Sequence, residues 1–382
     1  MNILIISPST YGTIAGLSFN LYRAFVASGQ VNTFLICLDG SQNDLPPDID
    51  SVIVVEKKQG RWWHQLGNAI RRIYAIRTMV RDKSINISIS TLLGCTLWNV
   101  MSLTKEDRKV GIFHTRPDQS KYLGLKKFLL FSLAYRMVMP RLDVVVAVNQ
   151  TAKDAIEDKY KVNTNLIYNI HDFKRINSLA SEPITEQDIF NRQTFLYVGH
   201  LTEIKAPERL LKAFAQMNAS KQFSLCFIGE GYLEPKLKEL VKDYDLEDCV
   251  VFLGFQRNPY KYIAKCKCLM LVSQDEGLPG VLIEALSLGK RVITTNSSKG
   301  VWEILQCSED YDPNLAYRYC NDLGVIVPNY YDTQERDNIT INELAQAMLD
   351  EVMREDETVI DGFDKSRFSA SYVVSQYMKL FK

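Results

Sequence analysis

The fold is decided by one stretch in the second half of the chain, Phe195-Leu-Tyr-Val198-Gly199-His-Leu-Thr-Glu-Ile-Lys205-Ala-Pro207. Its first four residues form a short apolar run, which predicts a buried strand, and Gly199 marks the turn after it. Pro207 falls where the first turn of a helix is expected, and the apolar residues that follow recur at helical spacing. The stretch therefore predicts a strand, a loop and a helix in succession.

The same alternation extends in both directions along the chain. Further strands are predicted at 3–7, 33–38, 51–55, 85–90, 110–114, 144–149, 225–228, 250–253, 268–272 and 291–295. Helical segments are predicted between them, including those near 65–80, 120–139 and 151–159. Because strands that alternate with helices form mainly parallel sheets, we expect an α/β protein with two doubly wound, Rossmann-like halves.

A polar, poorly periodic segment at 171–192 separates the two halves, and we interpret it as a linker. The first domain is then expected at 1–170 and the second at 193–362. The last segment, 363–382, contains a predicted helix with apolar residues along one side.

The composition is that of an ordinary globular protein, with 382 residues of which 46% are hydrophobic and 24% are charged. The 45 Lys and Arg residues balance the 45 Asp and Glu residues, which argues against a basic nucleic-acid-binding protein. Residues 1–170 hold 21 basic and 13 acidic side chains, or +8, so the other 24 and 32 give −8. Halves of opposite charge favour two domains with different partners.

Cysteine usage and the apolar runs bear on the compartment. The eight cysteines include no C-x-x-C pair, so we interpret them as reduced core residues of a cytosolic protein. The N-terminal run 1–8 lacks the features of a signal peptide, and the apolar stretch 128–135 is too short to cross a bilayer. We expect a cytoplasmic protein that is either soluble or bound to the inner face of the cytoplasmic membrane.

Two carboxylates frame the clearest chemical signal, Ser273-Gln-Asp-Glu276-Gly-Leu-Pro-Gly-Val-Leu-Ile-Glu284. Gly277 and Pro279 place Glu276 in a loop, whereas Glu284 falls in the helix predicted over 281–288. The free N–H groups at the start of that helix suit a diphosphate, so the two acids could bracket one ligand. Taken alone, two acids at this spacing are more typical of solvated side chains.

The order of the surrounding segments adds to this signal. They are Tyr197–Pro207, Phe227–Gly231, Val251–Phe255, Glu276–Glu284, Ala285–Ile293, Ser298–Leu305 and Leu323–Pro328. In this order and spacing they resemble the C-terminal domain of the retaining, nucleotide-sugar-dependent glycosyltransferases of family 4 (group 1), which have the GT-B fold. The resemblance is dense over 193–330 and looser over 1–170. It implies two domains facing a central cleft, with the C-terminal helix packing back on the N-terminal domain.

The resemblance assigns roles to the matching side chains. It implies that Glu284 accepts hydrogen bonds from the ribose hydroxyls of the donor, and that Glu276 faces the donor sugar at the reacting centre. Lys205 would stabilise the diphosphate leaving group.

Backbone roles follow from the same resemblance. Contacts to the donor sugar and phosphates would come from the loop and helix start made by Gly277, Leu278, Pro279, Gly280, Val281 and Leu282. Gly254 and Phe255 would border the base, within 254–257. Gly16, at the tip of the first loop, would let the N-terminal domain approach the diphosphate without a Cβ in the way.

One position departs from the family pattern. Relatives usually carry Arg directly after the strand glycine, here Gly199, as a second phosphate cation, whereas this chain has His200. A neutral imidazole carries no full charge at pH 7. Either His200 binds the donor in its protonated form, or another cation substitutes, or the leaving group is less stabilised. A loop histidine without a ligand is an equal alternative.

His114 ends the strand predicted at 110–114, where ligands gather in parallel α/β sheets. Family members often carry a histidine near here, so we predict that His114 is catalytic, although a lone histidine is often structural. Arg116, two residues later, could meet an acceptor phosphate; the alternative is a solvated arginine.

No cofactor and no metal are expected. Asp48 and Asp50 resemble the D-x-D motif of the other glycosyltransferase fold, but they follow Pro46-Pro47 in a polar loop without a phosphate-binding context. We interpret them as solvent-exposed.

The basic half contains two amphipathic stretches. The first, 57–83, holds eight Lys and Arg residues against Asp82, together with Trp62 and Trp63. The second, 121–131, mixes Lys121, Lys126 and Lys127 with large apolar residues. Such segments bind anionic lipid surfaces, although ordinary helices with solvated cations are an equal interpretation.

These patterns predict an enzyme, a hexosyltransferase, that moves a sugar from a nucleotide sugar, expected to be a UDP-sugar, to a sugar hydroxyl of a polysaccharide or lipid-linked oligosaccharide. Two alternatives stay open at this point: a nucleotide-sugar epimerase of the same fold, and a non-catalytic partner subunit that kept the fold.

Overall fold

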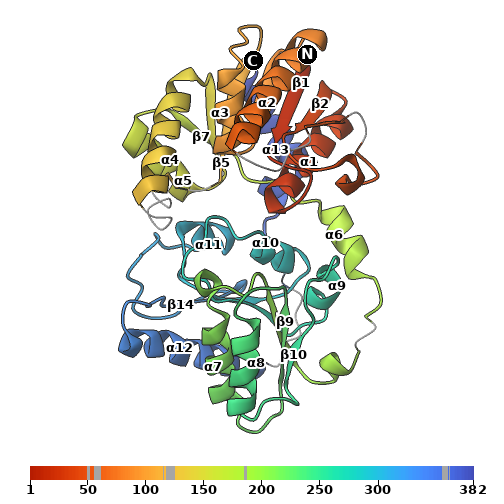
Figure 1. Cartoon of the computed structure of the whole chain (residues 1–382). Helices are drawn as coiled ribbons and strands as arrows, with labels where there is room; N and C mark the ends of the chain where they lie inside the picture. The colour runs from red at the N-terminus through yellow and green to blue at the C-terminus, as the bar shows by residue number, and fades with distance from the viewer. Residues whose placement is uncertain are drawn as a thin grey trace. The chain divides into compact units, whose positions relative to one another are not determined.

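The computed structural model describes residues 1–49, 52–55, 62–114, 116–117, 125–184, 187–354, 360 and 362–382. The described chain forms two compact units (Figure 1). Unit 1 consists of Met1–Asp172 together with Ser366–Lys382, and unit 2 consists of Phe173–Lys365. Each unit contains its own sheet, as the alternation of strands and helices predicts.

The described part of unit 1 holds a seven-stranded sheet of order β3-β2-β1-β4-β5-β6-β7, in which every pairing is parallel. Its strands are β1 (Asn2–Ser7), β2 (Asn32–Cys37), β3 (Val52–Val54), β4 (Ile87–Ser90), β5 (Arg108–Phe113), β6 (Val144–Ala147) and β7 (Thr164–Leu166). Its helices are α1 (Thr13–Ser28), α2 (Trp62–Asp82), α3 (Leu93–Met101), α4 (Leu125–Val138), α5 (Gln150–Tyr160) and α13 (Ala370–Leu380). The strand order reverses between β1 and β4, which makes this the doubly wound arrangement.

The apolar run at the start of the chain shows why both faces of this sheet are covered. Successive side chains of a strand point to opposite faces. Ile3 and Ile5 pack in the core that contains α1 and α13, whereas Leu4 and Ile6 pack with α2. The C-terminal helix α13 therefore belongs to unit 1, as predicted.

The described part of unit 2 holds a second seven-stranded sheet, of order β10-β9-β8-β11-β12-β14-β13. Its strands are β8 (Thr194–Val198), β9 (Ser224–Ile228), β10 (Val250–Phe252), β11 (Cys268–Leu271), β12 (Val292–Thr295), β13 (Tyr319–Cys320) and β14 (Gly324–Val327). All pairings are parallel except that of β13 with β14. Its helices are α6 (Phe173–Ala180), α7 (Pro207–Met217), α8 (Glu234–Asp243), α9 (Tyr260–Ile263), α10 (Gly280–Ser287), α11 (Lys299–Ile304) and α12 (Gln334–Val352).

The segment predicted as a linker, 171–192, has structure of its own. It contains α6 and a 3-10 helix, Gln187–Asn191, and all but its first two residues group with unit 2. Helix α6 contacts α9, and Asn258 Nδ2 donates to Leu179 O over 2.8 Å. The sequence did not predict α6, because this helix buries only one apolar residue, Ile176.

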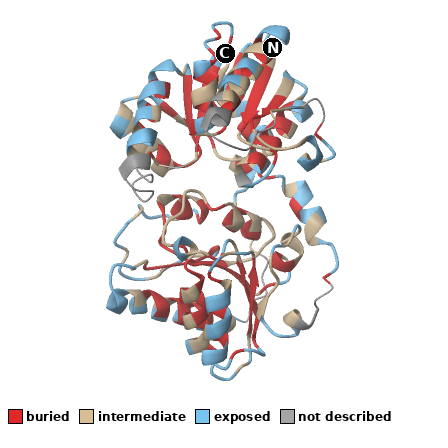
Figure 2. Cartoon of the chain, in the orientation of Figure 1, coloured by how far each residue is buried: buried red, intermediate tan, exposed pale blue. Residues whose placement is uncertain are grey.

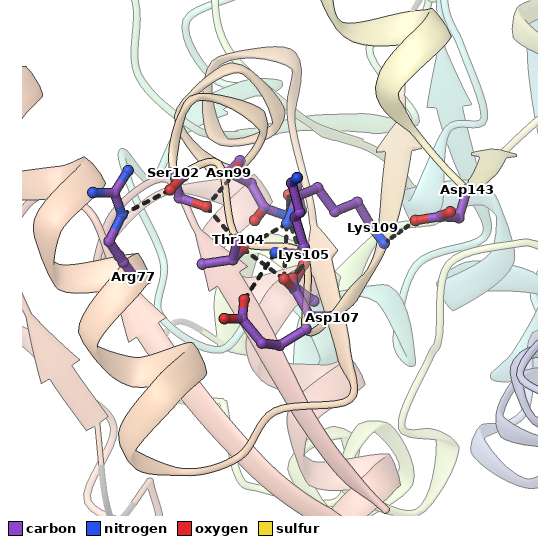
Figure 3. Close-up of polar contacts among 11 residues, drawn as sticks. Arg77, Asn99, Ser102, Thr104, Lys105, Asp107, Lys109 and Asp143 are labelled. Carbon is purple, nitrogen blue, oxygen red and sulfur yellow. Dashed lines mark hydrogen bonds and ion pairs between the residues drawn. The ribbon is translucent and has the colours of Figure 1, made fainter.

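In both units the strands form the buried layer and the outer faces of the helices are exposed (Figure 2). Unit 1 also buries a polar cluster at the amino ends of β4 and β5 (Figure 3). There Asp107 accepts hydrogen bonds from Ser88 Oγ, Thr104 Oγ1 and Lys109 Nζ, the last over 2.9 Å. This cluster lies at the opposite edge of the sheet from the one where ligands bind in such folds.

Candidate functional site

The site in unit 2 is built at the carboxyl ends of β8 and β11, which are neighbours in the sheet although far apart in sequence. The strand order of unit 2 reverses between these two strands, and ligands bind at such a switch point in open α/β sheets. The loop after β8 carries Lys205, and the loop after β11 carries Glu276.

Lys205 and Glu276 form an ion pair, with 2.6 Å between Nζ and Oε1. The hydroxyl of Ser273 donates to the same oxygen over 2.6 Å. The pair is only partly buried, with 28% of the Lys205 side chain and 10% of the Glu276 side chain exposed. A cation held by a carboxylate at a strand-end loop can bind the phosphates of a ligand, because the ammonium has three donors and uses one here.

Backbone contacts tie the two loops together. Gln274 N donates to Ile204 O over 2.8 Å, which joins the β11 loop to the residue before Lys205. Gly229, at the end of β9, has a φ of +129°, and a Cβ there would lie 2.0 Å from Gly199 O. A side chain at position 229 would clash with Gly199. Glycine therefore allows the loops after β8 and β9 to pack in direct contact.

Glu284 lies in α10, as predicted, and is partly buried. Burial raises the pKa of its carboxyl to about 7, while a hydrogen bond donated by the Tyr260 hydroxyl over 3.4 Å opposes the rise. A carboxylate that is costly to charge when no ligand is bound is suited to accept hydrogen bonds from ligand hydroxyls.

The start of α11 contacts the loop between Glu276 and Glu284. Ser298 Oγ donates to Gly277 O over 3.1 Å. A Cβ at Gly300 would lie 2.1 Å from the same oxygen, so a glycine is needed at this close approach. Helix α10 begins at Gly280, directly after Pro279, one residue earlier than the sequence suggested. Leu278 and Val281 are partly buried, whereas Leu282 is a core residue.

Gly254 and Phe255 follow β10 at the same edge of the sheet. Gly254 has a φ of +63°, and its carbonyl accepts from Gly229 N over 2.8 Å. Phe255 is 67% exposed, which leaves an aromatic face available to a planar ligand.

His200 is exposed, and the hydrogen bonds found for it among the described residues are to its backbone carbonyl. Its carbonyl accepts from the Tyr197 hydroxyl over 2.8 Å. Gly199 packs beside it, with Tyr197 Oη 3.3 Å from where a Cβ would lie.

His114 and Arg116 belong to unit 1, so they are described apart from the donor loops. His114 follows β5, and its Nε2 is buried with no hydrogen-bond partner among the described residues. Burial lowers the pKa of the imidazole to about 4, so the ring is neutral at pH 7. Arg116 is partly buried two residues further on.

The position of Gly16 differs from the prediction. It is the fourth residue of α1 and donates its N–H to Gly12 O over 3.1 Å, so it does not lie at the tip of a loop. Gly12, directly before the helix, has a φ of +87°, a value that favours glycine. The space that a Cβ at Gly16 would enter is still open.

The described residues contain no group of three or more His, Cys, Asp or Glu side chains arranged to hold a metal ion. Asp48, part of the D-x-D look-alike, forms an ion pair with Arg23, 2.6 Å from Oδ2 to Nε. Asp50 lies outside the described residues. None of the eight cysteines, all of which are described, forms a disulfide, and six of them are buried.

Ser273 begins the motif that ends at Glu284, but the sequence did not predict its hydrogen bond to Glu276. The sequence shows only a serine three residues before an acid. The structure shows that its side chain is buried and donates to that acid, which an ordinary serine at the end of a strand need not do.

Several known proteins are similar to this chain in sequence or in fold. Residues 184–310 match the family model described as Glycosyl transferases group 1. The chain is 27% identical over 272 residues to an uncharacterised glycosyltransferase of Methanocaldococcus jannaschii, covering 67% of each chain. It is 32% identical over 183 residues to the Campylobacter jejuni N-acetylgalactosamine-N,N'-diacetylbacillosaminyl-diphospho-undecaprenol 4-alpha-N-acetylgalactosaminyltransferase, covering 47% of each. This chain thus aligns with less than half of the Campylobacter enzyme.

The fold also matches solved structures. Anabaena HepE, in complex with UDP and glucose, superposes with a TM-score of 0.74 at 17% identity, covering 99% of this chain and 98% of that one. At this identity the likeness concerns the fold, which is GT-B. The matched domain, the relatives and the fold together make this chain a glycosyltransferase of the GT-B fold that carries a glycosyl transferases group 1 domain.

Proposed function

We propose that the protein is a retaining hexosyltransferase that uses a UDP-sugar and acts on a sugar hydroxyl of a polysaccharide or lipid-linked oligosaccharide. The observation that carries the proposal is the Lys205–Glu276 pair at the carboxyl ends of β8 and β11. The resemblance assigns the cation to the diphosphate and the acid to the donor sugar, and the close approach of the two side chains supports this assignment. The Campylobacter relative is named for transfer to a diphospho-undecaprenol substrate, and HepE was solved with UDP, which supports the donor and acceptor classes.

Donor binding would use three features of unit 2. Glu284 accepts hydrogen bonds from the ribose hydroxyls, and the ligand compensates there for the burial that raises its pKa. The exposed ring of Phe255 stacks beside the base. The first N–H groups of α10 face the phosphates, where free donors and the helix dipole favour negative charge.

The chemical step would depend on stabilising the diphosphate as it leaves. Lys205 supplies a positive charge where negative charge develops, and Glu276 and Ser273 fix the position of its ammonium before the donor binds. We assign attack by the acceptor to the same face of the sugar from which the diphosphate departs. This accounts for retention.

His114 would face the sugars as a neutral hydrogen-bonding group. Its buried Nε2 has no partner among the described residues, and its low pKa excludes a role as a cation at pH 7. Arg116 would meet an acidic acceptor group nearby.

We also propose that unit 1 binds an anionic membrane surface. Helix α4 exposes five large apolar side chains, those of Leu129, Leu130, Phe131, Leu133 and Met137. Helix α2 exposes Ile70 and Tyr74 among its arginines. Lys57, Lys58, Arg61 and Lys121 lie outside the described residues, as do the side chains of Trp62, Trp63, Lys126 and Lys127. No helix among the described residues is long and apolar enough to cross a bilayer.

Liposome flotation at low salt tests the membrane proposal. Vesicles with anionic lipid should carry the protein upward, and Leu130→Glu on α4 should reduce that binding. Leu349→Glu, at an exposed leucine of α12 in unit 2, is the matched control and should bind as the wild type does. Failure to float with anionic vesicles would refute this part of the proposal.

A panel of nucleotide sugars tests the activity. Glycosyltransferases of this kind are expected to hydrolyse their donor slowly when no acceptor is present, so we expect free UDP from one UDP-hexose and none from GDP-sugars. Release of GDP instead would overturn the nucleotide assignment, and conversion of the sugar without nucleotide release would favour an epimerase.

A further inference from the structure

Asn329 lies two residues beyond the end of β14, and both ends of its amide are in use. Its Nδ2 donates to Gln274 O over 2.9 Å and to Ser273 O over 3.3 Å. Its Oδ1 accepts from Arg209 Nη1 over 2.9 Å. The two carbonyls belong to the short turn that leads from β11 to Glu276, so this side chain links the end of β14 to that turn.

Arg209 fixes which way the amide points. Its side chain, in α7, is nearly fully buried, and it donates to Asp337 Oδ1 over 2.6 Å and to Tyr330 O over 2.7 Å. A guanidinium has only donors, so it selects the oxygen of the Asn329 amide and leaves the amino group directed at the turn.

The turn that Asn329 holds carries one partner of Glu276, Ser273, and is bonded to the residue before the other partner, Lys205. Ser273, whose hydroxyl donates to Glu276, has its carbonyl fixed by Thr295 Oγ1 over 2.6 Å as well as by Asn329. Gln274 N donates to Ile204 O, next to Lys205. A displacement of the turn would therefore move Ser273 and Lys205 relative to the Glu276 carboxylate.

We propose that Asn329, oriented by Arg209, is a positioning residue for the Lys205–Glu276 pair. It touches neither side chain of the pair and acts through the backbone of Ser273 and Gln274. The inference rests on the proposed function of that pair. Asn329→Asp would place a carboxylate oxygen against two carbonyl oxygens, and the repulsion would displace the turn.

Asn321 provides a matched control at the other end of the same strand. It also makes three side-chain hydrogen bonds, donating to Leu305 O over 2.7 Å and accepting from Leu323 N and Gly324 N over 2.9 and 3.1 Å. It lies at the amino end of β14, at the edge opposite Glu276. Asn321→Asp therefore tests the loss of an equivalent structural asparagine.

The first measurement is hydrogen–deuterium exchange of the peptide spanning 273–276, which needs no substrate. Asn329→Asp should raise its exchange rate by at least about tenfold, since the amide of Gln274 is protected by the bond to Ile204. Asn321→Asp should leave it unchanged. Unchanged exchange in the Asn329 variant, or an equal rise in both variants, would overturn the inference. If Asn329→Asp does not fold, Asn329→Ala, which adds no charge, replaces it and should raise the exchange rate of the same peptide.

The second measurement is UDP release from the donor that the panel identifies. Asn329→Asp should lower kcat on the order of 10- to 100-fold, with KM within about threefold, because a misplaced group affects the chemical step most. In a Glu276→Gln background the same substitution should cost less than about twofold. An equal loss in both backgrounds would show that Asn329 does not act through Glu276. If the wild type releases no UDP, the proposed function fails and the exchange experiment still decides the positioning role.

Discussion

Two lysine–carboxylate pairs, one in each unit, have similar lengths and different surroundings. In unit 1 the Lys109–Asp107 pair spans 2.9 Å, and 8% of the lysine and none of the aspartate side chain is exposed. In unit 2 the Lys205–Glu276 pair spans 2.6 Å, with 28% and 10% exposed. The first lies at the amino ends of strands and the second at the carboxyl ends.

The difference lies in what else each pair contacts. Lys109 donates to Thr104 as well as to Asp107, and Asp107 also accepts from Ser88 and Thr104, so both members of this pair, which we call closed, have further partners inside the protein. Lys205 has a hydrogen bond to Glu276 alone in the described structure, which leaves two of its donors for solvent or a ligand. Loss of one member of a closed, buried pair destabilises the fold, whereas a pair with donors to spare at a strand-end loop can bind substrate.

Removing the open cation should have the largest effect. Lys205→Ala should lower the rate of UDP release by about 10²- to 10³-fold, because the charge on the leaving diphosphate is no longer stabilised. Its melting temperature should stay near that of the wild type. Lys238→Ala, which breaks the exposed pair with Glu234, is the control and should change neither. Full activity of Lys205→Ala would contradict the assignment of this pair.

Opening the closed pair should affect stability alone. Asp107→Ala leaves the buried Lys109 ammonium without its carboxylate, which should cost about 3–5 kcal/mol in urea unfolding. Donor turnover per folded molecule should be unchanged. Asp245→Ala removes the partner of Lys221, a pair of 2.6 Å on the surface, and should leave the urea midpoint in place. Equal losses from the two variants would mean that burial does not distinguish the pairs.

Glu284→Gln should make the protein more stable at pH 8 and weaken its binding of UDP. The folded pKa of about 7 lies above the unfolded value, so the wild type loses stability as pH rises from about 4.5 to 7. The neutral amide avoids that loss, and the variant should be more stable at pH 8 by about 1–3 kcal/mol. It should also bind UDP about tenfold more weakly, since the amide cannot accept both ribose hydroxyls. A variant that loses stability and keeps its affinity for UDP would contradict the role of Glu284.

The pH dependence of UDP binding is the smallest and most specific effect. If the ionised Glu284 binds the ribose, affinity should fall as the carboxyl protonates, to about one tenth at pH 6 of its value at pH 8. Calorimetric titration of Glu284→Gln with UDP over the same pH range is the control. It gives the pH dependence of the affinity that is due to protonation of the UDP phosphates alone. The difference between the two curves isolates the carboxyl, and parallel curves would exclude it.

Much of this could be predicted from sequence because the strands are short apolar runs that end in glycine or polar residues. The motif from Ser273 to Glu284 supplied Glu276 in a loop and Glu284 in a helix, and both positions are correct. The ion pair between Lys205 and Glu276 was not predicted, because it depends on the pairing of β8 with β11. The paired residues Phe195 and Cys268 are 73 positions apart, and local patterns do not reveal the pairing of strands so distant in sequence.

Other features were hidden by polar residues on buried faces. Helix α12 was not predicted because its buried side includes Thr340 and Glu351, which Tyr330 and Arg291 satisfy. Gly16 was placed in a loop, whereas the chain already enters α1 at Thr13 and Gly12 makes the turn. The partner of Glu351, Arg291, is 60 residues away, so local patterns carry no record of it, whereas the helix start at Gly12 is a local feature that the sequence pattern missed.

The most direct test of the account compares the binding of UDP and uridine to the wild type and to Lys205→Ala by calorimetry. The account predicts that the wild type prefers UDP by at least about tenfold, since the diphosphate meets Lys205 and the start of α10. The preference should shrink in Lys205→Ala, while Asp107→Ala keeps it. Equal affinity of the wild type for UDP and uridine, or no binding of either, would contradict the claim that this edge of the sheet binds a nucleoside diphosphate.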